Sequence, residues 1–134
     1  MIIVDTNVVV ALLVPGDATE LAERLLNFDD RWFAPPLCRS EFLQVFVQEL
    51  KRGKLGPSEI LPTLISFARV VELLPAPSAE SVVSLALKTG CSAYDCEFVA
   101  TAELMKCRLA TFDRMVYERF PSVAAHPSRL MADE

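Results

Sequence analysis

The chain is poor in the residues on which several enzyme chemistries depend. It has 134 residues but one histidine, His126, so a site built on paired imidazoles is excluded. Its four glycines form neither a GxGxxG nor a GxxxxGKS/T pattern, which excludes phosphate loops made of glycine backbone. Its four cysteines contain no CxxC pair. We therefore expect neither a zinc site nor a redox motif, but reduced and buried thiols.

Long hydrophobic runs are also missing. Near the N-terminus, Asp5 and Asn7 interrupt the apolar residues, and no basic segment precedes them. The remaining run, from Val8 to Val14, is far shorter than the roughly 18 apolar residues that a membrane span needs. We expect a cytoplasmic protein without membrane contact.

Apolar residues are nevertheless abundant. They make up 52% of the chain, and the mean hydropathy is +0.34. The length fits one domain over residues 1–134, with the last several residues as a candidate loose tail. The hydrophobic surplus suggests an apolar face that a partner covers. The formal charge of −5 seems to disfavour a nucleic-acid substrate, because 18 acidic against 13 basic side chains should repel phosphate.

Short apolar runs alternate with longer helical patterns, which is typical of an α/β fold with a parallel sheet. We expect strands at residues 2–4, 32–34, 70–74, 108–111 and 122–125. We expect helices at residues 7–13, 17–28, 36–52, 58–69, 78–88, 94–106 and 113–119. Asp17 is the expected cap of the second helix, and Pro62 leaves a late start or a kink open for the fourth. The predicted architecture is a central parallel sheet of four or five strands with helices on both faces.

Four acidic residues stand at noteworthy positions. Asp5 and Asp113 each follow a predicted strand, where either could simply cap the next helix. Asp95 lies in the first turn of its helix, where the helix dipole favours a negative charge. Glu41 borders the apolar stripe of its helix, and its stem could pack there while its head stays in water.

Their combination suggests a shared site. Open α/β sheets bind ligands at the carboxyl ends of their strands, so Asp5 and Asp113 meet if the first and fourth strands are neighbours. The helix starts that carry Glu41 and Asp95 could close the same crevice. Four carboxylates sharing one pocket need a cation, and hard oxygen ligands suit Mg²⁺ or Mn²⁺. Such ions activate water against phosphodiesters.

Four sequence segments now carry a resemblance: VDTN at 4–7, SEF at 40–42, SAYDCEFVATA at 92–102 and LATFD at 109–113. In order and spacing they resemble the successive motifs of the PIN domain, and more narrowly those of the VapC-like ribonuclease toxins of bacterial toxin–antitoxin pairs. The resemblance covers nearly the whole chain. It implies a PIN fold and a metal-dependent endoribonuclease that is usually dimeric and inhibited by a cognate antitoxin, which we expect to bind an apolar groove.

The resemblance also assigns roles to residues. Asp5, Glu41, Asp95 and Asp113 match the acidic residues that hold one or two Mg²⁺ or Mn²⁺ ions and carry out catalysis. Polar neighbours match positions that support those acids or contact substrate: Thr6, Asn7 and Thr111. The expected reaction is in-line attack of water on the scissile phosphate, leaving 5′-phosphate and 3′-hydroxyl ends.

The surroundings of these motifs bear on how RNA would bind. Basic residues flank the motifs, mostly as ordinary solvated helix surface, and Arg114 is the one we select as a phosphate contact. Setting the four site acids aside leaves 14 acidic against 13 basic residues, a nearly neutral surface. The acidity then predicts that RNA binding requires metal.

Two other classes remain open from the residues alone. A phosphotransfer or phosphatase domain also places an aspartate after its first strand, but the haloacid-dehalogenase pattern needs a second aspartate where this chain has Asn7. A receiver-type domain needs a lysine after a late strand, where Thr111 and Asp113 stand. A non-catalytic interaction module with structural carboxylates is the remaining alternative, and metal titration separates it from a nuclease.

Overall fold

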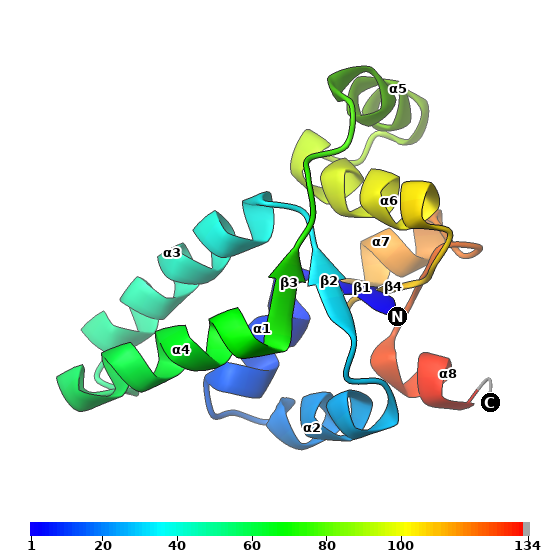
Figure 1. Cartoon of the computed structure of the whole chain (residues 1–134). Helices are drawn as coiled ribbons and strands as arrows, with labels where there is room; N and C mark the ends of the chain where they lie inside the picture. The colour runs from blue at the N-terminus through cyan, green and yellow to red at the C-terminus, as the bar shows by residue number, and fades with distance from the viewer. Residues whose placement is uncertain (133–134) are drawn as a thin grey trace.

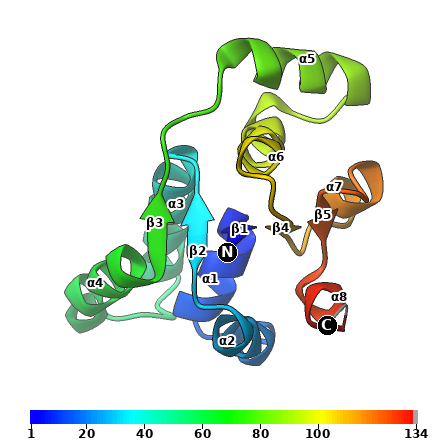
Figure 2. The ribbon, with the colours of Figure 1, turned by 45° about the vertical axis from the view of Figure 1, so that its right-hand side comes forward.

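Five short parallel strands form the central sheet in the order β3-β2-β1-β4-β5. Figure 1 shows this sheet between the helices, and Figure 2 labels its strands in that order. They are β1 (Ile2–Val4), β2 (Trp32–Ala34), β3 (Val71–Leu73), β4 (Leu109–Ala110) and β5 (Ala124–Ala125). The computed structural model describes residues 1–132. The parallel sheet with helices on both sides confirms the predicted fold class, and the fifth strand is present.

Eight α-helices and one 3-10 helix surround the sheet in the described part of the chain. They are α1 (Thr6–Leu13), α2 (Thr19–Phe28), α3 (Leu37–Lys51), η1 (Pro57–Glu59), α4 (Ile60–Val70), α5 (Ala79–Thr89), α6 (Ala93–Met105), α7 (Arg114–Arg119) and α8 (Pro127–Ala132). Figure 1 shows α1 to α4 on one side of the sheet and α5 to α7 on the other. This is what right-handed crossovers produce when the chain first moves outward from β1 to β3 and then returns to β4.

The core lies between the sheet and these two helical layers. Ile3, Val4 and Leu109 have no exposed surface, as expected for strands covered on both faces. On the α3–α4 side, the Phe42 ring stacks on Phe46 at 5.7 Å and meets Phe67 at 4.8 Å between ring centroids. These aromatic contacts join α3 to α4, so the pair extends from the sheet as one unit (Figure 1).

The structure corrects the expected start of α2 and decides where α4 begins. The prediction that Asp17 caps the second helix is wrong, because α2 begins at Thr19 after Ala18. The Thr19 hydroxyl instead accepts a hydrogen bond from the Gly16 amide at 3.0 Å, which closes the preceding turn. Pro62 falls in the first turn of α4, where its missing N–H has no helical partner to lose. The helix therefore begins before the proline.

The described part of the chain ends in a short helix. Residues 127–132 form α8, which the sequence pattern did not predict, and α8 packs against α2. Residues 133–134, at the end of the expected tail, lie outside the described residues. Over the described part, no helix is long and apolar enough to cross a membrane. The four cysteines are free, as expected, and three of them are buried: Cys38, Cys91 and Cys96.

Candidate active site

The carboxyl ends of β1 and β4 form the point where the chain changes direction across the sheet. Val4 pairs with Ala110, so the residues that follow these two strands stand side by side. The helix after β1 packs on one face of the sheet and the helix after β4 on the other (Figure 1). A crevice opens where such helices diverge, and it is the usual ligand site of open α/β sheets. Asp5 and Asp113 both lie there, as the sequence predicted for neighbouring first and fourth strands.

Asp5 is held by hydrogen bonds to each of its carboxylate oxygens. It is the N-cap of α1, and its Oδ1 accepts a hydrogen bond from the Thr6 amide at 2.8 Å. Its Oδ2 accepts from the Thr111 hydroxyl at 2.7 Å. Asp5 can therefore both cap the helix and take part in the site. One oxygen caps the N-terminus of α1, and the other accepts a hydrogen bond from the residue that follows β4.

Thr111 and Asn7 connect the loops after β4 and β1. Thr111 is fully buried, and its hydroxyl also accepts hydrogen bonds from the Asp113 amide at 3.0 Å and from Asn7 Nδ2 at 3.3 Å. The side-chain oxygen Oδ1 of Asn7 accepts a hydrogen bond from the Phe112 amide at 3.1 Å. These bonds fix the positions of Asp5 and Asp113 relative to each other, which is a supporting role for both polar residues.

The other two acids lie on helices of the two layers: Glu41 in the second turn of α3, and Asp95 in the first turn of α6. Glu41 Oε1 accepts a hydrogen bond from the buried Thr6 hydroxyl at 2.7 Å, so it faces α1 and is not a free rim side chain. Ser92 caps α6 by accepting from the Asp95 amide at 3.1 Å. Asp113 caps α7 by accepting from the Met115 amide at 3.0 Å.

All four predicted acids line one open cleft of about 350 Å³. Its lining consists of Asp5, Thr6, Asn7, Val10, Glu41, Val45, Asp95 and Asp113. Within residues 1–132, no three carboxylate, imidazole or thiol groups converge tightly enough to enclose an ion by themselves. An ion in this cleft would therefore need oxygen ligands from water or substrate as well as from the protein.

The electrostatics of the cleft favour a cation. Burial raises the pKa of Asp5 to about 6, against the lowering effect of its bonds to Thr111 and Thr6, and the charges of Asp95 and Glu41 raise it further. Burial also raises the pKa of Asp95, and the charge of Asp113 adds to this. Carboxylates that repel one another in a half-buried cleft bind a divalent ion with relief of that repulsion.

Cys38 lies under this cleft but does not add a sulfur ligand. It is completely buried, and burial raises the pKa of its thiol to about 12, with Asp5 and Glu41 adding to the shift. Since the thiolate is the metal-binding form, the donors of the cleft are oxygens. The residues present thus fit a hard divalent cation such as Mg²⁺ or Mn²⁺.

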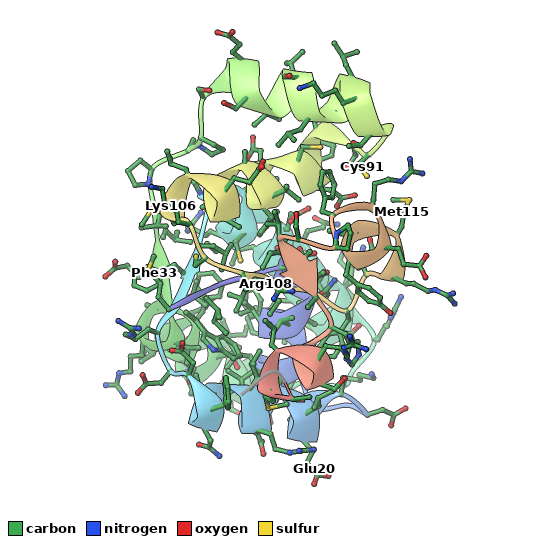
Figure 3. All side chains as sticks on the ribbon, turned by 90° about the vertical axis from the view of Figure 1, so that its right-hand side faces the viewer. Glu20, Phe33, Cys91, Lys106, Arg108 and Met115 are labelled. Carbon is green, nitrogen blue, oxygen red and sulfur yellow. The ribbon has the colours of Figure 1, made fainter. Side chains whose placement is uncertain are left out.

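The basic residues near the motifs lie outside the cleft lining. Arg114, the expected phosphate contact, is exposed, and its Nε pairs with Glu118 Oε1 at 2.6 Å. A contact with phosphate would require Arg114 to exchange this partner. At the far end of α3, the nearly buried Glu49 binds Arg52 at 3.1 Å and Lys54 at 3.8 Å. Figure 3 shows Arg108 beside β5, where its Nε donates to the Val123 carbonyl at 3.2 Å.

His126 is closer to the site than its position in the chain suggests. It follows β5, and its ring meets Phe112, the neighbour of Asp113, with 5.2 Å between ring centroids. Its Nδ1 accepts a hydrogen bond from the Ser128 amide at 3.2 Å. It does not line the cleft. No motif in the sequence signals this packing, because it arises from the pairing of β4 with β5.

Known proteins resemble this chain in sequence and in fold. The family model of the PIN domain matches residues 2–122. Ribonuclease VapC3 from Pyrobaculum aerophilum is 30% identical over 126 residues, which span 91% of this chain and 96% of the relative. The crystal structure of PAE2754, also from Pyrobaculum aerophilum, superposes with a TM-score of 0.77 at 17% identity, covering 98% of this chain and 87% of the other. FitAcB from Neisseria gonorrhoeae superposes with a TM-score of 0.59 at 22% identity, covering 96% and 99%. The two solved structures share the fold.

Proposed function

Because this chain belongs to the PIN domain family, with a VapC ribonuclease as a full-length relative, we propose that it is a divalent-metal-dependent endoribonuclease and the toxin of a type II toxin–antitoxin pair. One observation carries the proposal. Four carboxylates, two that cap helices and two from the first two turns of other helices, line a single cleft at the carboxyl edge of the parallel sheet. A module with purely structural carboxylates has no need to bring them together.

The four acids of the cleft and the two threonines that bond to them have defined parts in this proposal. Asp5, Asp95 and Asp113 hold one or two Mg²⁺ or Mn²⁺ ions, and Glu41 contacts an ion directly or through water. When bound, such ions polarise the phosphate and lower the pKa of water for attack on it. The bond from Thr111 orients the Asp5 carboxylate, and the bond from Thr6 orients Glu41. Because His126 does not line the cleft, proton transfer there falls to carboxylates and water.

This chain offers an antitoxin an apolar groove whose lining is separate from that of the cleft. This groove, of about 420 Å³, runs between α3, α4 and β3, and its lining consists of Arg39, Phe42, Leu43, Leu64, Phe67, Ala68, Val71 and Leu73. It provides the partner-covered face that the high apolar content suggests. Exposed Val83 and Leu87 on α5 form a separate apolar area, suited to the homodimer. We assign the protein to the cytoplasm, the compartment expected for a toxin that cleaves RNA.

Cleavage of RNA by matched variants tests the proposal. Wild type should cut single-stranded or structured RNA only with Mg²⁺ or Mn²⁺, and its products should carry 5′-phosphates. Asp5→Asn should lower kcat/KM at least a hundredfold, since the cleft loses a carboxylate that the bonds from Thr6 and Thr111 hold in place. Asp17→Asn makes the same change at an exposed position outside the cleft and should retain full activity. Equal cleavage by wild type and Asp5→Asn, or cleavage in excess chelator, would refute the proposal.

A further inference from the structure

A second hollow adjoins the carboxylate cleft along α3. It has a volume of about 450 Å³, and its lining consists of Leu37, Ser40, Glu41, Gln44, Val45, Gln48 and Tyr94. Glu41 and Val45 line both hollows, so the two are continuous. We call this second hollow the α3–Tyr94 groove. Its lining joins the first turn of α3, through Leu37 and Ser40, to the first turn of α6, through Tyr94.

The polar residues of the groove are evenly spaced and unused by the fold. Ser40, Gln44 and Gln48 follow one another at four-residue intervals, so they form a row on one side of α3. All three are exposed, and within residues 1–132 neither glutamine amide makes a hydrogen bond. A primary amide offers a donor and an acceptor together, the combination that pairs with the edge of a nucleobase.

Tyr94 supplies a flat aromatic surface at the end of this row. It is the residue before Asp95 in the first turn of α6, its side chain is 65% exposed, and within residues 1–132 its ring stacks on no other ring. An aromatic ring exposed next to a nuclease site is suited to stacking with an unpaired base. The groove contains no basic residue, and Glu41 is its one acid. Its chemistry therefore suits a neutral base better than a phosphate.

We propose that the α3–Tyr94 groove binds the unpaired base of the nucleotide adjoining the scissile phosphate. The base stacks on Tyr94, and the amides of Gln44 and Gln48 contact its edge. Because Glu41 belongs to both hollows, a base seated in the groove brings its own phosphate to the carboxylates. The inference rests on the proposed ribonuclease function and adds to it a preference for single-stranded over paired RNA, since a paired base has no free face.

Binding of short RNAs tests this inference separately from cleavage. Fluorescein-labelled octaribonucleotides are titrated in Ca²⁺ in place of Mg²⁺, and binding is followed by fluorescence anisotropy. Tyr94→Ala should weaken the binding of single strands about tenfold, since stacking on one aromatic ring is lost. Tyr94→Phe keeps the ring and should bind within about twofold of wild type. Leu104→Ala, which truncates another exposed side chain of α6, is the matched control.

Base contacts and kinetics provide two further readouts. The double variant Gln44→Ala/Gln48→Ala should alter the order of affinities among rA, rC, rG and rU homopolymers, because the amides face the base edge. In cleavage assays with Mn²⁺, Tyr94→Ala should raise KM about tenfold and leave kcat within about twofold. RNA duplexes of the same length should bind weakly and equally to wild type and Tyr94→Ala.

The outcomes separate this inference from the proposed function. If wild type cleaves RNA and Tyr94→Ala matches it in affinity and KM, the groove does not bind a base, although the nuclease proposal stands. If wild type cleaves nothing but Tyr94→Ala still loses affinity for single strands, the nuclease proposal fails and base binding stands. A change of Tyr94→Ala from dimer to monomer, or a loss of bound antitoxin with unchanged RNA binding, would assign the groove to a protein and overturn the inference.

Discussion

Asp5 shows how one side chain can serve both the fold and the site. One carboxylate oxygen caps α1, and the other accepts a hydrogen bond from the Thr111 hydroxyl. The position of the side chain is therefore fixed before any ligand binds. The cost of this fixed position is a half-buried carboxylate near Asp95 and Glu41, which is why its pKa rises to about 6. A residue with this environment is poised to exchange its proton for a cation as the pH rises.

The raised pKa of Asp5 predicts how stability depends on pH without metal. A folded-state pKa of about 6 lies above the ordinary value of 3.8, so protonation stabilises the folded state. This contribution is complete below about pH 4 and is lost as the pH rises through 6. In excess chelator, we expect wild type to lose on the order of 2 kcal/mol between pH 4 and pH 7 through this group.

Asp5→Asn provides the comparison for this effect. The amide is uncharged at every pH, and its carbonyl oxygen can still accept the hydrogen bond that caps α1. In metal-free urea unfolding, we expect the variant to show a flatter pH profile than wild type, and to be at least as stable at pH 7. Asp17→Asn should follow the wild-type profile. Parallel profiles for wild type and Asp5→Asn would contradict the assigned pKa.

The burial and ion pairs of Glu49 could not be predicted from the sequence. By composition it counts as one of the acids between the bases of α3, whereas in the structure it is 8% exposed and holds Arg52 and Lys54. Two positive charges that could have faced RNA are thus tied to the end of α3. No local pattern distinguishes this glutamate from the exposed acids of the other helices.

At the scale of elements, the site is built from the N-terminal parts of four helices. Asp5 and Asp113 cap α1 and α7, while Asp95 lies in the first turn of α6 and Glu41 in the second turn of α3. Three of these helices, α1, α3 and α7, follow directly after strands, so their starts lie at the carboxyl edge of the sheet, and α6 reaches the same edge after α5. The partial positive charge of helix N-termini also eases the grouping of carboxylates there.

The cap of α6 can be tested by itself. Ser92 accepts a hydrogen bond from the amide of Asp95, and Ser92→Ala leaves that amide without its partner. We expect Ser92→Ala to lower the free energy of unfolding by about 1 kcal/mol in chemical denaturation. Ser92→Thr keeps an acceptor and should lose less. Ser122→Ala, at an exposed serine outside any helix, should be neutral, and a comparable loss there would argue against a capping effect.

Element boundaries were predictable where a local signal existed. Gly90 ends α5 with a positive φ of 75°, and the Ser78 cap begins it, so the expected helix agrees closely with the structure. The start of α2 and the whole of α8 were not predicted correctly. Asp17 has a capping side chain at a position where the Thr19 hydroxyl closes the turn instead, and α8 is a short helix that packs against α2. The turn before α2 is a local alternative to the Asp17 cap, and the pattern alone does not decide between them, whereas α8 depends on a distant neighbour.

For the molecule as a whole, charge and metal are linked. Apart from the four cleft acids, 14 acidic and 13 basic residues remain, so most of the net negative charge of −5 comes from the cleft. A phosphate approaching the metal-free cleft meets carboxylates, whereas bound divalent ions would neutralise them.

This distribution predicts that divalent ions promote RNA binding more than ionic strength alone explains. Added Mn²⁺ should raise the melting temperature of wild type, because a ligand bound to the folded state stabilises it. Single-stranded RNA should bind wild type measurably in Mn²⁺ or Ca²⁺ and at least tenfold more weakly in chelator with NaCl of equal ionic strength. Asp95→Asn should reduce both responses. Equal RNA affinity with and without divalent ions would show that the cleft charge is not what limits binding.

The five strands, the helices from α1 to α7, the four acids and the family resemblance could be obtained from the sequence, whereas α8 could not. Periodicity, caps and motif spacing are properties of neighbouring residues, so they are readable without a structure. From the sequence, we could say only that Asp5 and Asp113 would meet if the first and fourth strands were neighbours in the sheet. Their adjacency in the sheet confirms it.

Folding in three dimensions determined the rest. The bond from Thr6 to Glu41 joins positions 35 apart in the chain, and the bond from Thr111 to Asp5 joins positions 106 apart. The groove beside the cleft likewise combines α3 with Tyr94 of α6, and His126 reaches Phe112 through the pairing of two strands. Such contacts depend on how the layers pack. A single sequence records which side chains are available, but not which of them the packing brings within reach of one another.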